Sequence, residues 1–394
     1  MDTVNETIAA APKAGDASAG KKKPRRRERD RIEYSRYRDD ALEFAYRFGG
    51  YTARQLSELL ELRYPELEAK TEAKVSPALR ASYRAIESMK RSRLFKKVAV
   101  RRGHLAGADG RVTPEDFAYL SPAEGGRAAV WAGSLCGVEK ARDAREGYRR
   151  HQLPGRPEHA SWRTDLILLL LWEACAAGVA APLEEAFGES FPGYPYWIAK
   201  PALDKAGAPL PTRKNARAYH DPAIPDASMV LYDVRFDLEV ERWTRTGAVG
   251  VRGKKGVVGK VERHASHWLG LLERAGGAAS PGGWPGMPEE VAPLVIVMRE
   301  HARAVSMRNR VGKAIIEGRL PRHAELARRM GRHRLRLGRL VLFVGWDRLV
   351  RDGPLDAGHS ALSSYGEGGG GLDDVPLDEA AAYVEHCREP GEEA

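Results

Sequence analysis

Residues 225–242, which read PDASMVLYDVRFDLEVER, carry the clearest strand pattern in the chain. Apolar, β-branched and aromatic residues dominate it, which predicts two strands, over 228–236 and 237–243. Two later runs, 292–299 and 338–346, contain the fully apolar segments LVIV and VLFV. Fully apolar strands are typical of a sheet that is covered on both faces. The second half of the chain therefore predicts an α/β domain with a buried sheet.

The acidic residues of this stretch share one side of the second strand. Side chains alternate between the two faces of a strand, so Asp237, Glu239 and Glu241 point together. Carboxylates gathered in this way repel each other unless a divalent metal, Arg or Lys side chains, or water at a sheet edge compensates them. Asp226, at the start of the preceding strand, is expected to converge on Glu239. Carboxylate oxygens suit Mg²⁺, which would activate water at a phosphodiester, so Asp226 and Glu239 are the candidate metal ligands.

Residues 38–121 predict three helices followed by a two-stranded hairpin, the element order of a winged helix-turn-helix. Thr52 and Gln55 have the spacing of a capping box at the start of the second helix. Ser76 precedes Pro77 at the start of the third helix, a position where proline is favoured. The two strands of the hairpin are expected over 94–102 and 116–121.

The third helix, about 77–92, is the element expected to enter the major groove of DNA. Its apolar stripe is predicted from Leu79, Tyr83, Ile86 and Met89. Its polar face carries Arg80, Arg84, Ser88 and Arg91. Arginine and serine contact either phosphates or base edges, and the pair Lys96-Lys97 in the first wing strand is expected to hold the DNA backbone. Alternatively, this polar face is the solvent-exposed side of an ordinary amphipathic helix and does not contact DNA.

Net charge separates the body of the chain from its C-terminal tail. Lys and Arg number 64 against 54 Asp and Glu, which gives +10. Residues 367–394 contain nine acids and one Arg, a charge of −8, so the remaining 366 residues carry the difference, +18. A basic segment at 21–38 and thirteen Lys or Arg against three acids at 299–339 hold much of this charge. Each of these two basic segments is either a solvent-exposed surface or a site of phosphate contacts. The net charge of +18 on residues 1–366 predicts a polyanionic partner.

Several protein classes are excluded by composition. Cys136, Cys175 and Cys387 lie far apart, which excludes a disulfide scaffold and a CxxC zinc module and fits a reducing compartment. The N-terminus has no basic region followed by an apolar run, so no secretory signal is expected. The most apolar stretch, 166–182, is short for a membrane span and contains Glu173, so we expect it within a long buried helix. We predict a cytoplasmic protein without a membrane partner.

Composition divides the chain into five segments. These are a disordered basic arm (1–37), the winged helix-turn-helix (38–125), a linker (126–158), the α/β domain (159–355), and a Gly-rich linker with an acidic tail (356–394). The run GEGGGG at 366–371 is expected to be part of that linker. His264 and His267 are expected to be packing or surface residues of a helix rather than metal ligands.

The spacing of the acids resembles the core of the PD-(D/E)XK nucleases. Pro225-Asp226 and Glu239-Val240 match the first parts of that motif, but Glu241 stands where the motif has Lys. In this superfamily the Lys can lie in the following helix, where the candidates are Lys254, Lys255 and Lys260. The candidate catalytic residues are therefore Asp226, Glu239, Glu241 and Lys260. An active nuclease, a nuclease-like fold that does not cleave, and an unrelated domain remain open.

The order of motifs along 38–355 resembles the replication-relaxation family of bacterial plasmids and other mobile elements. The family's Leu-Ser/Thr-Pro-x-x-Gly turn after the wing is matched by 120–125, LSPAEG. Its His before a Leu-rich helix is matched by His159, and its Pro-Asp-Ala by 225–227. Its strand F-x-L-E-V-D-R-x-T is matched by 236–244, FDLEVERWT, with Glu in place of the Asp.

The resemblance implies a winged helix-turn-helix followed by a restriction-endonuclease-like α/β domain, with Lys260 as the best match to the family's downstream Lys. It implies binding of double-stranded DNA in plasmid replication, mobilisation or topology control, together with other plasmid proteins. One rival hypothesis is a metal-dependent DNA endonuclease or nickase. The other is a transcription regulator or nucleoprotein assembly adaptor, in which the α/β domain forms a homodimer or binds partners and the acidic tail competes with DNA.

Overall fold

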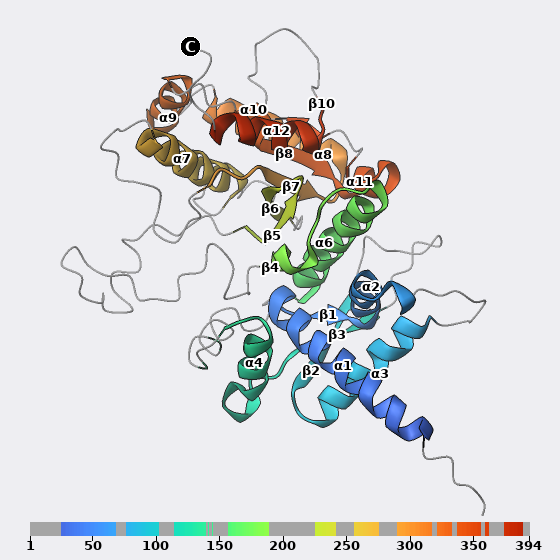
Figure 1. Cartoon of the computed structure of the whole chain (residues 1–394). Helices are drawn as coiled ribbons and strands as arrows, with labels where there is room; N and C mark the ends of the chain where they lie inside the picture. The colour runs from blue at the N-terminus through green and yellow to red at the C-terminus, as the bar shows by residue number, and fades with distance from the viewer. Residues whose placement is uncertain are drawn as a thin grey trace, which may run out of the picture.

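The computed structural model (Figure 1) describes residues 25–67, 76–101, 114–138, 141, 144, 157–188, 225–241, 256–275, 290–316, 321–332, 337–355, 359–361 and 374–388. Lys254, Lys255 and the GEGGGG run lie outside the described residues, as do residues 1–24 of the expected basic arm.

The N-terminal part consists of helices packed on a small three-stranded sheet. Its elements are α1 (Arg25–Phe48), β1 (Tyr51–Thr52), α2 (Ala53–Arg63), the short 3-10 helix η1 (Pro65–Leu67), α3 (Pro77–Arg91), β2 (Phe95–Arg101) and β3 (Pro114–Leu120). The strands pair antiparallel in the order β1-β3-β2. The predicted capping box is confirmed, because Thr52 and Gln55 each accept a hydrogen bond from the other's backbone N–H. The predicted start of α3 is confirmed as well, with Ser76 as the cap.

Two boundaries of this part differ from the expectation. The first helix begins at Arg25, so part of the arm expected to be disordered is helical. A further helix, α4 (Ala123–Leu135), lies at the start of the expected linker and contacts α1. It buries Ala128, Ala129 and Ala132. Small side chains of this kind allow close helix packing, but together with the three glycines of α4 they give a weak helical pattern in the sequence.

The C-terminal part is built on a seven-stranded sheet with the order β10-β9-β8-β7-β6-β5-β4. The strands are β4 (Phe187–Gly188), β5 (Ala227–Leu231), β6 (Val234–Glu241), β7 (Leu294–Met298), β8 (Val341–Gly345), β9 (His359–Ala361) and β10 (Asp374–Val375). The central strands β6, β7 and β8 are parallel, and the other neighbouring pairs are antiparallel. The predicted mixed α/β class is confirmed, and every residue of β7 and β8 is buried.

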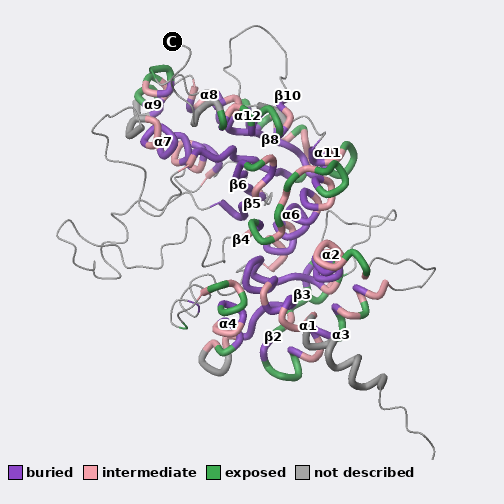
Figure 2. The backbone as a smooth tube through the Cα atoms, viewed as in Figure 1, coloured by how far each residue is buried: buried purple, intermediate pink, exposed green. Residues whose placement is uncertain are grey.

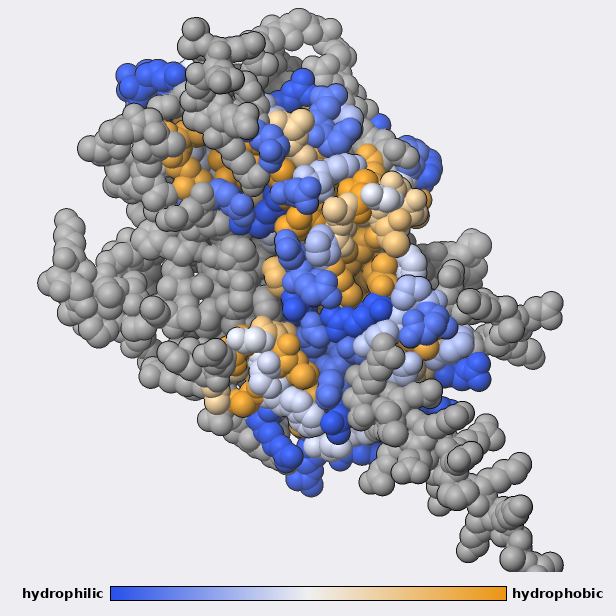
Figure 3. All heavy atoms as spheres, in the orientation of Figure 1, coloured by the Kyte–Doolittle hydropathy of each residue, from blue (hydrophilic) through white to orange (hydrophobic). Residues whose placement is uncertain are grey.

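Helices cover both faces of this sheet (Figures 1 and 2). They are α6 (Pro157–Ala177), α7 (Val257–Ala275), α8 (His301–Ile315), α9 (Pro321–Arg332), α10 (Leu337–Leu340), α11 (Trp346–Asp352) and α12 (Leu377–Arg388), with the short 3-10 helix η3 (Leu183–Glu185) after α6. The predicted burial of α6 is confirmed along its inner side. On α11, the apolar side chain of Val350 is 57% exposed. Figure 3 shows that hydrophobic surface alternates with hydrophilic surface on the face of the molecule in view. None of the helices in the described ranges is long and apolar enough to cross a membrane.

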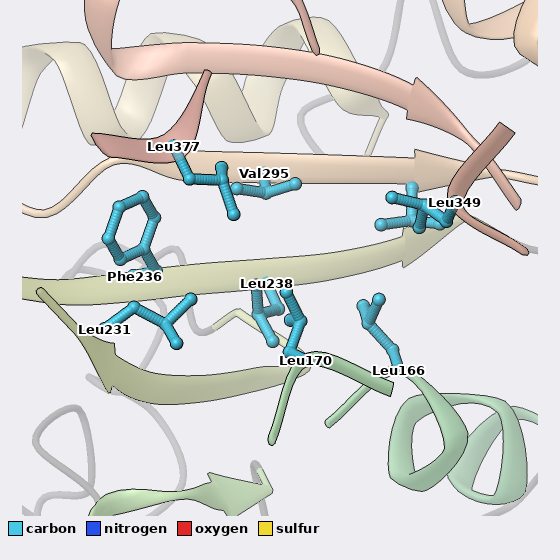
Figure 4. Close-up of a pocket in the computed structure, with 9 residues that line it drawn as sticks. Leu166, Leu170, Leu231, Phe236, Leu238, Val295, Leu349 and Leu377 are labelled. Carbon is cyan, nitrogen blue, oxygen red and sulfur yellow. The ribbon is translucent and has the colours of Figure 1, made fainter. Parts of the chain in front are cut away.

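A small cavity of about 10 Å³ lies inside the C-terminal core (Figure 4). Its lining is Leu166 and Leu170 of α6, Leu231, Phe236, Leu238, Val295 and Val297 of the sheet, Leu349 of α11 and Leu377 of α12. A cavity of this size has room for about one water molecule, and cavities lined only by apolar side chains stay dry. It is therefore a packing defect between α6 and the sheet rather than a binding site.

The hairpin between β5 and β6 turns earlier than expected. The sequence analysis divided the two strands between residues 236 and 237, whereas β5 ends at Leu231 and β6 begins at Val234. Tyr232 and Asp233 form the turn with φ of 53° and 59°. Two successive residues with positive φ are typical of the two-residue hairpin turn whose twist matches the strands. Asp233, a residue type that favours turns, lies inside the first expected strand and indicated the turn.

The expected linker and acidic tail at 356–394 instead contribute to the domain. β9 pairs antiparallel with β8, and β10 pairs with β9, which extends the sheet. Val375, Leu377 and Val384 are buried, so α12 packs with its apolar side inward. The acids of α12 lie outward; Glu379, for example, pairs with Arg339. The negative charge of the tail concealed this amphipathic helix, and residues 374–388 form part of the folded domain.

The N-terminal half of α6 joins the two parts of the molecule. Gln55 Nε2 of α2 donates to the backbone oxygen of Ser161 at 2.7 Å and to Asp165 Oδ1 at 2.7 Å. Arg163 donates to the backbone oxygen of Phe48. These groups are buried, and burial makes each of these hydrogen bonds costly to remove. The small sheet and the large sheet are thereby held against one helix.

Replacement of Gln55 by leucine is expected to lower the free energy of unfolding by roughly 2–3 kcal/mol, because it leaves the Thr52 N–H and the Ser161 oxygen buried without their partner. Urea denaturation measures this loss. The control is Arg54→Ala, whose side chain is 66% exposed, with a change below about 0.5 kcal/mol. Equal effects of the two substitutions would contradict a structural role of the Gln55 contacts.

Candidate functional site

The acids predicted from the sequence lie on one face of the large sheet, beneath α7. Asp237 and Glu239 of β6 are buried, and Glu241 follows them at the end of the strand. Asp226 immediately precedes β5, and Ala227 pairs with Leu238, so Asp226 lies next to Glu239 across the hairpin. Asp226 Oδ2 accepts a hydrogen bond from the backbone N–H of Val240 at 2.8 Å. The expected convergence of Asp226 on this strand is present.

Lys260 of α7 is the cation that compensates these carboxylates. Its Nζ lies 2.5 Å from Glu239 Oε2 and 3.0 Å from Glu241 Oε1. Burial raises the pKa of Glu239 well above its usual value, and the attraction of Lys260 opposes that rise. Burial disfavours the charged form of Lys260, but the attraction of Glu239, Asp226 and Glu241 outweighs it and raises the pKa of the ammonium group. The sequence left open whether a metal, a basic side chain or water compensates the carboxylate charges. In the structure, the Lys260 side chain compensates them.

His159, near the start of α6, is a member of this site that the sequence analysis did not assign to it. Its Nε2 lies 2.7 Å from the Val240 carbonyl oxygen and 3.3 Å from Asp226 Oδ2. Both neighbours are acceptors, so Nε2 carries a proton. Burial lowers the pKa of His159, but the hydrogen bond and charge of Asp226 together with the Val240 carbonyl outweigh burial and raise the pKa overall. Burial opposes ionisation of Asp226, yet its contacts with His159, with the charge of Lys260 and the Val240 N–H, hold its pKa below the usual value.

The pairing of His159 with Asp226 predicts a pH-dependent contribution to stability. The pKa of His159 is raised in the folded chain, so its contribution is complete below the unfolded value of about 6.5 and is lost as pH rises through the folded value. We expect His159→Asn to cost about 1.5–3 kcal/mol at pH 5.5, as for other hydrogen bonds to charged groups, and less at pH 8.5. Urea denaturation at both pH values measures the difference. A cost that grows with pH would contradict the assignment.

Deeper on the same face, a second set of polar groups is packed between β6 and α7. Asp237 faces Arg235 at 3.6 Å and His264 Nδ1 at 3.9 Å. Burial lowers the pKa of His264 to about 3, and its ring packs on Trp268 with centroids 5.6 Å apart. His264 and His267 are both buried, in agreement with the expectation that they are packing residues.

The described residues contain no group of three or more His, Cys, Asp or Glu side chains arranged to hold a metal ion. Asp226 Oδ2 and the Val240 carbonyl oxygen are engaged by their neighbours, and Glu239 Oε2 is engaged by Lys260. Glu239 Oε1 is buried and has no hydrogen-bond partner within the described part of the chain. The site thus consists of the carboxylates of Asp226, Glu239 and Glu241 with the side chains of Lys260 and His159.

The predicted DNA-contact residues lie on α3 and β2 of the N-terminal part. Arg80, Arg84 and Arg91 are exposed on α3, Ser88 is half-buried, and Lys96 is exposed on β2. Lys97 differs from the expectation. It bonds to Glu87 of α3 and lies 3.3 Å from Asp116 of β3, so it joins α3 to the three-stranded sheet, and its side chain is only 15% exposed.

The apolar stripe predicted for α3 is correct for Ile86 and Met89 and wrong for Tyr83. The buried face consists of Ala78, Ser82, Ala85, Ile86 and Met89. Tyr83 is 53% exposed and lies between Arg80 and Arg84 on the outer side. Small residues at 78, 82 and 85 allow α3 to pack closely, which moves the centre of the buried face away from Tyr83.

The basic region at 299–339 includes α8 and α9. Arg310, Arg328 and Arg332 are exposed, and Glu325 pairs with Arg328 and lies 3.9 Å from Arg332. Glu325 therefore neutralises part of this positive charge. On α3 the one acid, Glu87, is bound by Lys97, so it does not neutralise the arginines.

No protein-family model, no curated protein and no solved structure matches this chain.

Proposed function

We propose that residues 38–121 form a winged helix-turn-helix that binds double-stranded DNA through the outer face of α3. The observation that carries this proposal is that Arg80 and Arg91 point away from the buried face of α3 and make no ion pair within the described residues. The element order helix, strand, two helices and two strands, with the sheet order β1-β3-β2, supports it. A helix of this position and charge suits the major groove.

The charge of the whole chain favours the same partner. A net charge of +10 attracts polyanions and speeds their encounter with the protein. The resemblance to the replication-relaxation family favours a role in plasmid replication, mobilisation or DNA topology. A C-terminal domain joined to α2 through α6 would then be carried to the DNA with the N-terminal part.

Binding is tested with the full chain and fluorescently labelled oligonucleotides of equal length, one duplex and one single strand, in fluorescence anisotropy titrations. We expect tighter binding to the duplex, because a helix in the major groove requires the duplex shape. Equal or tighter binding to the single strand would contradict the proposal, and so would the absence of binding to both.

A second candidate function is metal-dependent cleavage of a phosphodiester at the acidic site. The observation that favours it is the buried, open Glu239 Oε1 beside Asp226 and Lys260. Mg²⁺ is commonly held by one or two carboxylates and keeps several waters, so Asp226 and Glu239 would suffice as ligands. When bound, such an ion lowers the pKa of its water and neutralises phosphate charge. Lys260 would stabilise the negative charge that develops on the phosphate.

Cleavage is tested by incubating supercoiled plasmid with the chain, with and without Mg²⁺, beside Glu239→Gln. This substitution keeps the size of the side chain and removes its charge. An enzyme would give nicked or linear plasmid that requires both the metal and Glu239. An unchanged plasmid with a normal mobility shift would leave a DNA-binding protein with an inactive domain.

A further inference from the structure

Tyr83 is a large aromatic side chain on the outer face of α3, which also carries Arg80 and Arg84. It is 53% exposed, whereas Ala78, Ser82 and Met89 of the same helix are buried. Covering the exposed part of an aromatic ring removes apolar surface from water, so a binding partner that covers the Tyr83 ring is stabilised by it.

The neighbours of Tyr83 determine which kind of partner fits. Arg80, Tyr83, Arg84 and Glu87 follow the spacing i, i+3, i+4 and i+7, so they form one stripe along α3. The acid in this stripe, Glu87, is bound by Lys97 of β2. The stripe therefore presents two arginines and one aromatic ring to a polyanion, with its only acid neutralised.

We propose that Tyr83 contacts base edges in the major groove and that thymine methyl groups are its main target. This inference rests on the proposed duplex binding by α3. The thymine C5-methyl group is an apolar feature that the major groove offers at an A·T pair, and an exposed ring is suited to cover it. Arg80 and Arg84 lie within one turn of Tyr83 and would hold the phosphates beside it. Arginine contacts to phosphates fix the position of α3, and Tyr83 then discriminates between sequences.

The test begins with selection of duplexes from a randomised pool by the full wild-type chain. Anisotropy titrations then measure affinity for an enriched duplex, for a scrambled duplex, and for the enriched duplex with deoxyuridine in place of thymidine, which lacks only the methyl groups. The variants are Tyr83→Ala and Tyr83→Phe, and the matched control is Val350→Ala, which also removes an exposed apolar side chain. Melting temperatures verify that all variants are folded.

We expect Tyr83→Ala to reduce the preference for the enriched duplex roughly tenfold, the usual effect of one lost base contact, with affinity for the scrambled duplex changed less than about twofold. Tyr83→Phe and Val350→Ala should keep the preference. Deoxyuridine should weaken binding by the wild type and not by Tyr83→Ala.

Three results would overturn the inference and leave duplex binding intact: no enriched sequence, an unchanged preference in Tyr83→Ala, or no effect of deoxyuridine. A loss of affinity for single strands alone in Tyr83→Ala would also overturn it, since the ring would then stack on unpaired bases. Failure of the wild type to bind any duplex would instead remove the proposed function itself.

Discussion

Replacement of both Arg80 and Arg91 by alanine is expected to weaken binding to duplex DNA by roughly 10- to 100-fold at 0.1 M salt. Each phosphate contact contributes about 0.9 to the slope of log affinity against log salt, so losing two contacts lowers affinity by nearly two powers of ten at this concentration. Both side chains are exposed, so the fold should be unaffected. Anisotropy titration with a labelled duplex measures the loss.

The matched control for this prediction is Arg328→Ala with Arg351→Ala, which removes the same net charge from α9 and α11. These side chains are 66% and 70% exposed. We expect the control to change affinity less than about threefold, because long-range attraction is screened within about 10 Å at this salt concentration. A larger loss of affinity in the control than in the α3 variant would show that DNA binds to the basic region of the C-terminal part.

Replacement of Lys260 by methionine is expected to lower the free energy of unfolding by about 3–5 kcal/mol, the usual result of leaving a buried charge without its partner. Glu239 is 1% exposed and depends on Lys260 for compensation. Burial holds the pKa of Glu239 above its usual value, so the folded chain takes up a proton more readily than the unfolded chain. Stability of the variant should therefore fall as pH rises from about 4.3 upward.

Two further variants make this prediction specific. Lys97→Met also removes a lysine that joins two carboxylates, but Glu87 is 43% exposed, so the expected loss is below about 1 kcal/mol. The double variant Lys260→Met with Glu239→Gln should recover a large part of the loss, because no carboxylate charge then remains buried at position 239. A double variant no more stable than Lys260→Met would show that methionine disrupts packing and that the ion pair is not the cause. Urea denaturation measures all four chains.

Local signals in the sequence were sufficient for much of the fold. The capping box of Thr52 and Gln55 and the cap of α3 at Ser76 depend on residues within three positions of each other. The alternation along β6 placed Glu239 and Glu241 on one side, and Lys260 was a candidate partner because it follows in the next helix.

The remaining features depend on contacts that local patterns do not contain. His159 reaches Val240 across 81 positions of sequence, and its partners are a backbone oxygen and Asp226, neither of which leaves a pattern near His159. The exposure of Tyr83 depends on how closely α3 packs. The helix at 377–388 was obscured by its own acids, whose side chains point away from the sheet.

The central claim is that the outer face of α3 holds duplex DNA, and the dependence of affinity on salt tests it most directly. Titrations of the wild type and of Arg80→Ala with Arg91→Ala, between 0.05 and 0.2 M salt, give the two slopes of log affinity against log salt. We predict that the slope of the variant is shallower by about 1.8, because two phosphate contacts are lost. Equal slopes would mean that these arginines do not touch the DNA backbone and would contradict the claim.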